Sequence, residues 1–254
     1  MQIFDVHTHM QDKRYIKGYD SVLKRAVKNS VVKMMCCGLH EYDWDQVLDI
    51  TNEAPEIYPA FGIHPWFVED RSSNWLDILE EKLLATTASV GEIGIDKVVL
   101  NSKKEENTQE MVFTEQLKLA KKLNRPVNIH CRNAWGKLIE IIDNTGLPDR
   151  GGLVHSYSGS HEMVKVLEKR GLMISFSGSV TKINNKKARK AVLSVSDKML
   201  LIETDSPDIN PEGITGLNEP KYILKNLETI AELRGKSMEE IASITFENSL
   251  RLFD

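Results

Sequence analysis

Short apolar runs alternate along the chain with longer stretches in which apolar positions recur at helical spacing. Eight such runs lie at 3–9, 31–39, 57–64, 88–95, 126–131, 152–157, 172–177 and 199–204. Most are dense in Val, Ile, Leu, Met and Ala with little alternation, which is typical of parallel strands covered by helices on their outer face. The stretches between them, such as 75–84 and 112–123, mix apolar residues with Glu and Lys at helical period. The pattern predicts eight strands that alternate with helices.

Eight parallel strands are the number that closes a barrel with a filled interior. Single α/β barrels run to roughly 250 residues, and this chain has 254 residues with no low-complexity linker. We therefore predict one (β/α)8 TIM-type barrel domain over residues 1–254. An open doubly wound sheet ranks second, because no Gly-rich phosphate-binding motif follows the first run. A capping box at 237–240 predicts the start of a final helix.

Composition and charge limit the partners and the cellular compartment that we expect for the protein. The net charge of −4 argues against a protein that coats duplex DNA, although an enzyme can still hold a short strand in one cleft. Three cysteines in a chain of this size indicate a reducing compartment rather than a disulfide framework. No apolar run reaches membrane-spanning length, and the N-terminus lacks the apolar stretch of a signal peptide. We expect a cytoplasmic protein without a membrane partner.

Six candidate metal ligands share one position, the end of a predicted strand. They are His7, His9, Glu92, His130, His155 and Asp205. Residues two apart in a strand point to the same face, so the two histidines of His7-Thr8-His9 should converge. The carboxyl ends of barrel strands meet at one mouth, where barrel active sites lie. The pattern predicts a metal site at that mouth.

The chemistry of these side chains favours one or two divalent ions. Imidazole with carboxylate suits Zn, Mn, Fe or Ni, and Mg less clearly, so Zn, Mg, Mn and Ni all remain candidates. Four histidines and two carboxylates exceed what one tetrahedral ion needs, and a carboxylate that bridges two ions would use the surplus. The ligand set predicts hydrolysis by a metal-activated water.

Other polar residues near the strand ends receive separate predictions. His64 ends the third run and is expected to act in substrate binding or proton transfer rather than as a fixed structural side chain. His40 is expected to be structural, and His161 to be solvated at the start of a helix. Cys131 follows a candidate ligand, but no base is evident for it, so we expect no nucleophilic role.

The sequence resembles the TatD family of metal-dependent deoxyribonucleases, within the amidohydrolase-like barrels. The resemblance runs through nearly the whole chain and rests on motifs at 5–9, 62–65, 91–96, 130–134, 175–178, 203–207 and 218–220. Three departures affect substrate contacts rather than ligands: Ser156-Tyr157 replaces the usual Cys-Phe pair, Leu217 replaces an Arg, and the segment 208–210 is unusually acidic.

The resemblance implies roles for the candidate residues. One metal ion would be held by His7, His9 and Asp205, and the other by His130 and His155. Glu92 would bridge the two ions. Asp205 would also orient or deprotonate the attacking water, so that Asp205, Glu92 and His64 form the catalytic set. His64 and Arg132 would face the scissile phosphate.

The substrate that we predict is single-stranded DNA, degraded by a monomeric 3′-5′ exonuclease. The segment 181–190, which includes Lys182, carries five cations and no acid and could draw a polyanion, although a solvated helix face is the other meaning of such a run. Trp66 and Phe67 could stack an unpaired base or could pack at the barrel rim. Hydrolysis of a C–N or C–O bond in a small molecule is the alternative function, because fold and ligands do not separate the two. A non-enzymatic binding module is disfavoured by the complete ligand set.

Overall fold

The predicted strands form a single parallel sheet whose order follows the chain. The computed structural model describes residues 1–15, 18–100 and 102–254. Neighbours in the sheet are neighbours in sequence, from β1 through to β8. The strands are β1 (Ile3–Thr8), β2 (Val31–Cys37), β3 (Ile57–Phe61), β4 (Ser89–Asp96), β5 (Val127–Arg132), β6 (Gly152–Val154), β7 (Leu172–Phe176) and β8 (Leu200–Ile202).

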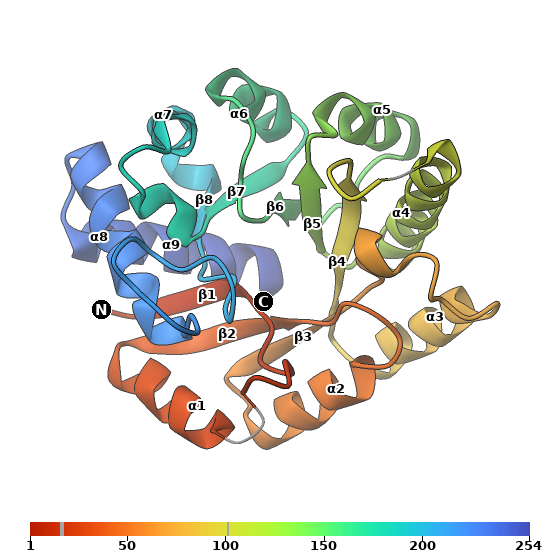
Figure 1. Ribbon diagram of the computed structural model, residues 1–254, viewed down its shortest axis with the longest axis horizontal. Helices are drawn as coiled ribbons and strands as arrows, with labels where there is room; N and C mark the ends of the chain where they lie inside the picture. Colours follow the sequence, from red (N-terminus) through yellow and green to blue (C-terminus); the bar gives the residue numbers. More distant parts are fainter. Residues whose placement is uncertain (16–17, 101) are drawn as a thin grey trace.

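Helices follow the strands and form a ring around them (Figure 1). They are α1 (Tyr19–Lys28), α2 (Trp44–Glu53), α3 (Trp75–Ala85), α4 (Lys103–Leu123), α5 (Trp135–Thr145), α6 (His161–Glu168), α7 (Lys186–Ser194), α8 (Ile223–Arg234) and α9 (Met238–Phe253). Short 3-10 turns occur at η1 (Pro65–Phe67), η2 (Gly178–Thr181), η3 (Asp197–Met199) and η4 (Pro220–Tyr222). The predicted capping box is present, since the Ser237 side chain accepts from the Glu240 N–H and the Glu240 side chain accepts from the Ser237 N–H.

The first and last strands meet and close the sheet into a nearly complete barrel. Thr8 and Ser206 form a parallel bridge. The His9 N–H donates to the Ser206 carbonyl at 2.8 Å, and the Asp205 N–H donates to the His7 carbonyl at 3.0 Å. The closing contacts therefore involve the same short segments that carry three of the predicted ligands.

Two apolar clusters hold the barrel together. The larger lies between strands and surrounding helices. The smaller is built almost wholly from strand side chains, including Phe4, Met35 and Leu201, and is joined by Leu252 of α9. It therefore fills the barrel interior, and α9 crosses behind the strands in Figure 1. Each fully buried Leu, Met or Phe contributes about 1.5–3 kcal/mol relative to an exposed one.

Several strands, among them β6 and β8, end earlier than their apolar runs predict. β6 and β8 contain three residues each, so His155 and Asp205 lie beyond them. Ser156 has a φ of 41° and Asp205 a φ of 58°, and these left-handed values cannot continue an extended strand. The chain turns at the barrel mouth, where the predicted ligands lie. No helix within the described ranges is long and apolar enough to cross a membrane.

Candidate metal centre

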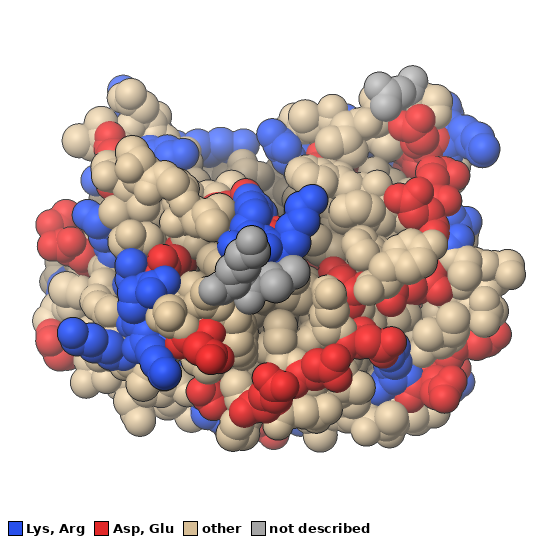
Figure 2. Space-filling view, turned by 60° about the horizontal axis from the view of Figure 1, so that its bottom comes forward, with Lys and Arg blue, Asp and Glu red and all other residues tan. Residues whose placement is uncertain are grey.

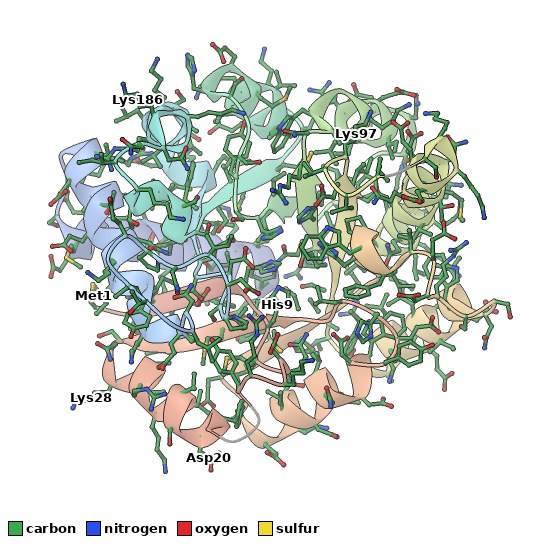
Figure 3. All side chains as sticks on the ribbon, viewed as in Figure 1. Met1, His9, Asp20, Lys28, Lys97 and Lys186 are labelled. Carbon is green, nitrogen blue, oxygen red and sulfur yellow. The ribbon has the colours of Figure 1, made fainter. Side chains whose placement is uncertain are left out.

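All six predicted ligands meet at the carboxyl ends of the strands. His7 lies in β1 and His9 directly after it. Glu92 and His130 lie in β4 and β5, while His155 and Asp205 follow β6 and β8. Figure 3 places His9 near the middle of the ring of helices. Residues as much as about 200 positions apart thus converge at one mouth, as the barrel geometry predicts.

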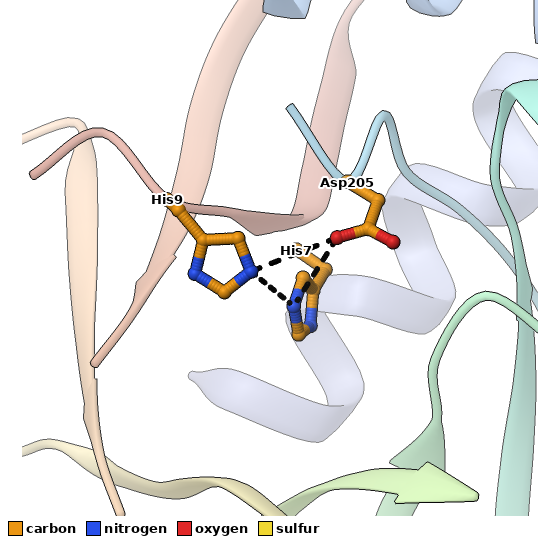
Figure 4. Close-up of side chains that lie close together, drawn as sticks. All are labelled: His7, His9 and Asp205. Carbon is orange, nitrogen blue, oxygen red and sulfur yellow. Dashed lines mark hydrogen bonds and ion pairs between the residues drawn. The ribbon is translucent and has the colours of Figure 1, made fainter. Parts of the chain in front are cut away.

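The first donor group consists of His7, His9 and Asp205 (Figure 4). The two histidine Nε2 atoms lie 3.2 Å apart. Asp205 Oδ1 lies 3.8 Å from the Nε2 atom of His7 and 3.6 Å from that of His9. These donors surround a common point.

The second donor group consists of His130 and His155, with Glu92 between the two groups. Oε1 of Glu92 lies 2.9 Å from His130 Nδ1 and 2.8 Å from His155 Nε2. Its other oxygen, Oε2, lies 3.2 Å from the Nε2 atom of His7 and 3.5 Å from that of His9. One carboxylate oxygen therefore faces each group, which is the arrangement of a bridging ligand.

Hydrogen bonds behind His7 and His9 fix which ring nitrogen carries the proton. Nδ1 of His9 contacts the Cys37 carbonyl at 2.8 Å, and a carbonyl can only accept. Nδ1 of His7 contacts Asn128 Oδ1 at 2.9 Å, and Asn128 is oriented because its Nδ2 donates to the Val6 carbonyl. In the neutral rings both Nε2 atoms therefore present lone pairs to each other at 3.2 Å. A cation between them removes this repulsion.

The second donor group is supported by two buried carboxylates that the sequence interpretation did not assign. Nε2 of His130 contacts Asp96 Oδ2 at 3.2 Å. Nδ1 of His155 lies 3.5 Å from Glu203 Oε1, which accepts from the Ser156 N–H at 2.6 Å. Metal-ligating histidines usually point their other nitrogen at such a carboxylate, which orients the ring and raises its basicity. Both acids occur in the motifs at 91–96 and 203–207, but only the folded barrel shows which histidine each contacts.

The spacing of the donors fits a small divalent ion. Ligands about 2.0–2.1 Å from a tetrahedral ion lie roughly 3.3 Å from each other. The contacts among the first donor group and from it to Glu92 range from 3.2 to 3.8 Å. Imidazole and carboxylate donors suit Zn, Mn, Fe or Ni. These four residues could therefore hold one ion with little rearrangement.

The electrostatics of the cluster also attract positive charge. Burial alone would lower the pKa of His9, but pairing with Asp205 and the charges of Glu92 and Asp205 raise it to about 9. Burial acts to raise the pKa of Glu92, yet the surrounding histidines hold it well below its usual value. The pKa of Asp205 is lowered by His9 and its neighbours in the same way. The carboxylates thus stay ionised and available to a cation.

His64 lies in the same cluster but has the opposite proton arrangement. Its Nδ1 accepts from the Trp66 N–H at 3.1 Å, so its neutral ring carries the proton on Nε2. That Nε2 lies 3.2 Å from Glu92 Oε1. Burial is the main reason that the pKa of His64 falls to about 4. His64 therefore presents a hydrogen-bond donor to the site, whereas the neutral rings of His7 and His9 present lone pairs.

Two buried glutamines of α4 hold the backbone on both sides of His64. Gln116 Oε1 accepts from the Ile63 N–H at 2.6 Å, and its Nε2 donates to the Ile63 carbonyl at 3.2 Å. Gln109 Nε2 donates to the Pro65 carbonyl at 3.1 Å, and its Oε1 accepts from the Asp96 N–H at 3.0 Å. Seven positions apart on one helix, they lie on the same face. The helix thereby fixes the peptide groups that carry His64.

A cavity of about 520 Å³ opens above the donor groups. Figure 2 shows the mouth as a hollow with Lys and Arg side chains on its rim. Arg132 and Lys187 line the cavity together with His64 and Trp66. Lys182, which the sequence interpretation placed at the substrate, is exposed and is absent from the described lining residues. The first turn of α7 carries Lys187 there instead.

The three residues expected to lack a role in the metal site occupy separate places. His40 is packed edge-on against the Phe67 ring, with centroids 4.8 Å apart. His161 is exposed at the first position of α6, next to Glu162. Cys131 is buried, and burial raises the pKa of its thiol to about 12. A thiol that stays protonated at neutral pH is a poor nucleophile.

Comparison with known proteins agrees with this geometry. Residues 4–254 match the family described as TatD related DNase. The chain is 35% identical to the uncharacterized metal-dependent hydrolase YabD of Bacillus subtilis, covering 99% of this chain and 98% of that protein. It is 29% identical to the 3′-5′ ssDNA/RNA exonuclease TatD of Salmonella typhimurium, with 99% of each covered. The crystal structure of YJJV, a TatD homologue from Escherichia coli, superposes with a TM-score of 0.93 at 30% identity, covering 99% of this chain and 97% of that one. The chain therefore belongs to the TatD family of metal-dependent hydrolases, which act on ester bonds.

Proposed function

We propose that this protein is a phosphodiesterase that removes nucleotides from the 3′ end of single-stranded DNA. The observation that carries the proposal is Glu92, whose two oxygens face separate donor groups at the base of a cavity lined by Arg132 and Lys187. Two ions held about 3.5–4 Å apart suit in-line displacement at a phosphate. The relative from Salmonella typhimurium, whose name describes such an exonuclease, supports the same substrate class.

The proposed ligand assignment follows the two donor groups. His7, His9 and Asp205 would hold one ion, His130 and His155 the other, and Glu92 both. Divalent ions at these positions would lower the pKa of water towards about 7 and neutralise charge on the phosphoryl oxygens.

Asp205 is proposed to take the proton of the attacking water. Its Oδ1 faces the first donor group, and its Oδ2 lies 4.0 Å from His155 Nδ1. Its side chain lines the cavity, and its lowered pKa keeps it ionised. We expect Asp205→Asn to retain much of the bound metal and to lose most of its turnover. Near-wild-type turnover by this variant would exclude the role.

His64 and Arg132 are proposed to bind the phosphate. The Nε2–H group of His64 points into the cluster, and a group with a pKa of about 4 remains a neutral donor at neutral pH. Arg132 is exposed at the end of β5 and lines the cavity. A guanidinium fork matches phosphate oxygens in charge and geometry.

The direct test uses single-stranded DNA labelled at its 5′ end or at its 3′ end. Wild-type protein is incubated with Mg, Mn, Zn or Ni and with chelator, beside the variant Glu92→Ala, Asp205→Ala. We expect stepwise shortening from the 3′ end that requires metal and disappears in the variant. Absence of cleavage by metal-loaded wild-type protein would refute the nuclease function and direct the search to small-molecule esters, amides or lactones.

A further inference from the structure

Trp66 differs from the other tryptophans of the chain in its exposure. Trp44 and Trp75 are buried, with exposed fractions of 0% and 7%, whereas Trp66 is 54% exposed and lines the cavity. Its neighbour Phe67 is partly buried and packs against the main apolar core. The two aromatic residues after His64 thus have different environments: Phe67 packs at the rim, and Trp66 leaves a large aromatic surface in contact with solvent at the site.

The indole of Trp66 is held in place at its polar edge. Its Nε1–H donates to Asp96 Oδ2 at 2.8 Å, the oxygen that also contacts His130. Asp96 is itself fixed, because its Oδ1 accepts from the Val98 N–H at 2.9 Å. The Trp66 and His64 rings stand nearly perpendicular, at 88°, with centroids 5.1 Å apart. A ring fixed in this way costs little conformational entropy when a ligand stacks on it.

Polar and cationic side chains face Trp66 from across the mouth. Trp66 follows β3, while Ser179, Asn185 and Lys187 follow β7, and these strands lie on opposite sides of an eight-stranded barrel. All four residues line the cavity, with the donor groups between them. A ligand that fills the cavity therefore meets an aromatic plane on one side and a cation on the other.

We infer that Trp66 is the platform on which the terminal base of the substrate stacks, so that the cavity takes a nucleotide with an unpaired base. The inference rests on the proposed phosphodiesterase function. The base lies on the indole, the scissile phosphate lies over the donor groups, and the rest of the strand runs towards Lys187. An indole face accepts any of the bases, so the platform selects for an unpaired nucleotide without selecting its sequence.

The test compares two single-stranded oligonucleotides that differ only in the 3′-terminal nucleotide, which carries a base in one and is abasic in the other. We expect wild-type protein to favour the base-bearing end by about 5- to 150-fold in kcat/KM, the range that base–aromatic stacking provides. Trp66→Ala should bring this ratio close to one. Trp66→Phe, which keeps an aromatic face but lacks the N–H donor, should retain most of the preference.

Controls separate stacking from a positional role. Tyr42→Ala removes another exposed aromatic side chain, outside the described cavity lining, and should leave the ratio unchanged. Equal losses on both oligonucleotides in Trp66→Ala, or an unchanged ratio, would overturn the platform. If wild-type protein cleaves neither oligonucleotide, the nuclease function fails, but binding of the same two oligonucleotides, measured by fluorescence anisotropy, still tests whether Trp66 is a stacking platform. Tighter binding of the base-bearing strand that Trp66→Ala abolishes supports the platform. Equal binding of the two strands by wild-type protein overturns it.

Discussion

Replacing Gln116 by Met should destabilise the protein by an amount set by two hydrogen bonds. The side chain is fully buried and binds both polar groups of the Ile63 backbone, at 2.6 and 3.2 Å. Met has a similar volume and no matching polar atoms, so the N–H and the carbonyl of Ile63 would both be left without their side-chain partner. A buried polar group left unsatisfied costs about 1–3 kcal/mol, which gives a loss of about 2–6 kcal/mol.

The measurement is the free energy of unfolding from urea titration of protein that has been freed of metal with chelator, so that metal binding does not mask the change. Gln46→Met is the matched control, because Gln46 is exposed on α2 and the same replacement should stay within about 0.5 kcal/mol of wild type there. If Gln116→Met unfolds at the same urea concentration as the control, the two hydrogen bonds do not fix the Ile63 peptide.

The same variant should also affect turnover through His64. Ile63 immediately precedes His64, so a relaxed peptide allows the Nε2–H group to move from its position 3.2 Å from Glu92. A displacement near 1 Å can lower a rate by up to about 100-fold. We expect kcat to fall while metal content, measured by elemental analysis, stays unchanged. A loss of metal in parallel with activity would contradict this explanation, since Gln116 makes no described contact with a ligand histidine.

Three further predictions concern the cluster and the cavity rim. Glu203→Gln keeps an acceptor for the Ser156 N–H but removes the negative charge beside His155. It should weaken metal binding by about 10- to 100-fold in chelator competition. Unchanged metal affinity would mean that Glu203 acts only as a hydrogen-bond acceptor for the backbone. The pKa of His9 is raised from an ordinary 6.5 to about 9, so its protonated form stabilises the metal-free protein below pH 6.5, and this contribution is lost as the pH rises to about 9. A metal ion must displace that proton and should therefore bind more tightly over the same pH window. Parallel pH trends in the unfolding and metal titrations would contradict this. Replacing Lys186 and Lys187 by Gln should reduce the slope of log K for single-stranded DNA against log salt by about 0.7 for each phosphate that is no longer neutralised; an unchanged slope would indicate a solvated helix face.

The barrel and the convergence of the ligands could be predicted because both depend on short-range pattern. Dense apolar runs at regular intervals specify parallel strands, and a polar residue at the end of such a run must lie at the mouth. His64 is set apart from the ligands because it ends the third run, and a role in substrate binding or proton transfer is predicted for it. Its Nε2–H tautomer depends on the Trp66 N–H, which the 3-10 turn η1 directs at the ring.

The partners behind the ligands could not be predicted, because they depend on distances between strands. Asn128 and Glu203 are ordinary polar residues in apolar runs until the barrel places them 2.9 Å from His7 and 3.5 Å from His155. In the sequence, Lys182 and Lys187 are two indistinguishable members of the cationic segment 181–190. Only the turn η2 and the phase of α7 decide that Lys187 lines the cavity.

The seam between β1 and β8 has a consequence for the maturation of the protein. His7 and His9 are synthesised at the start of the chain, and Asp205 follows about 200 residues later, yet the three meet where the barrel closes. An ion shared by them would act as a removable cross-link across a very long loop and, like a disulfide, would oppose the entropy of the open chain. Its coordination would be completed only after the eighth strand has left the ribosome. Barrel closure and metal loading would then be one late step of biosynthesis, and a nascent chain shorter than this would lack both.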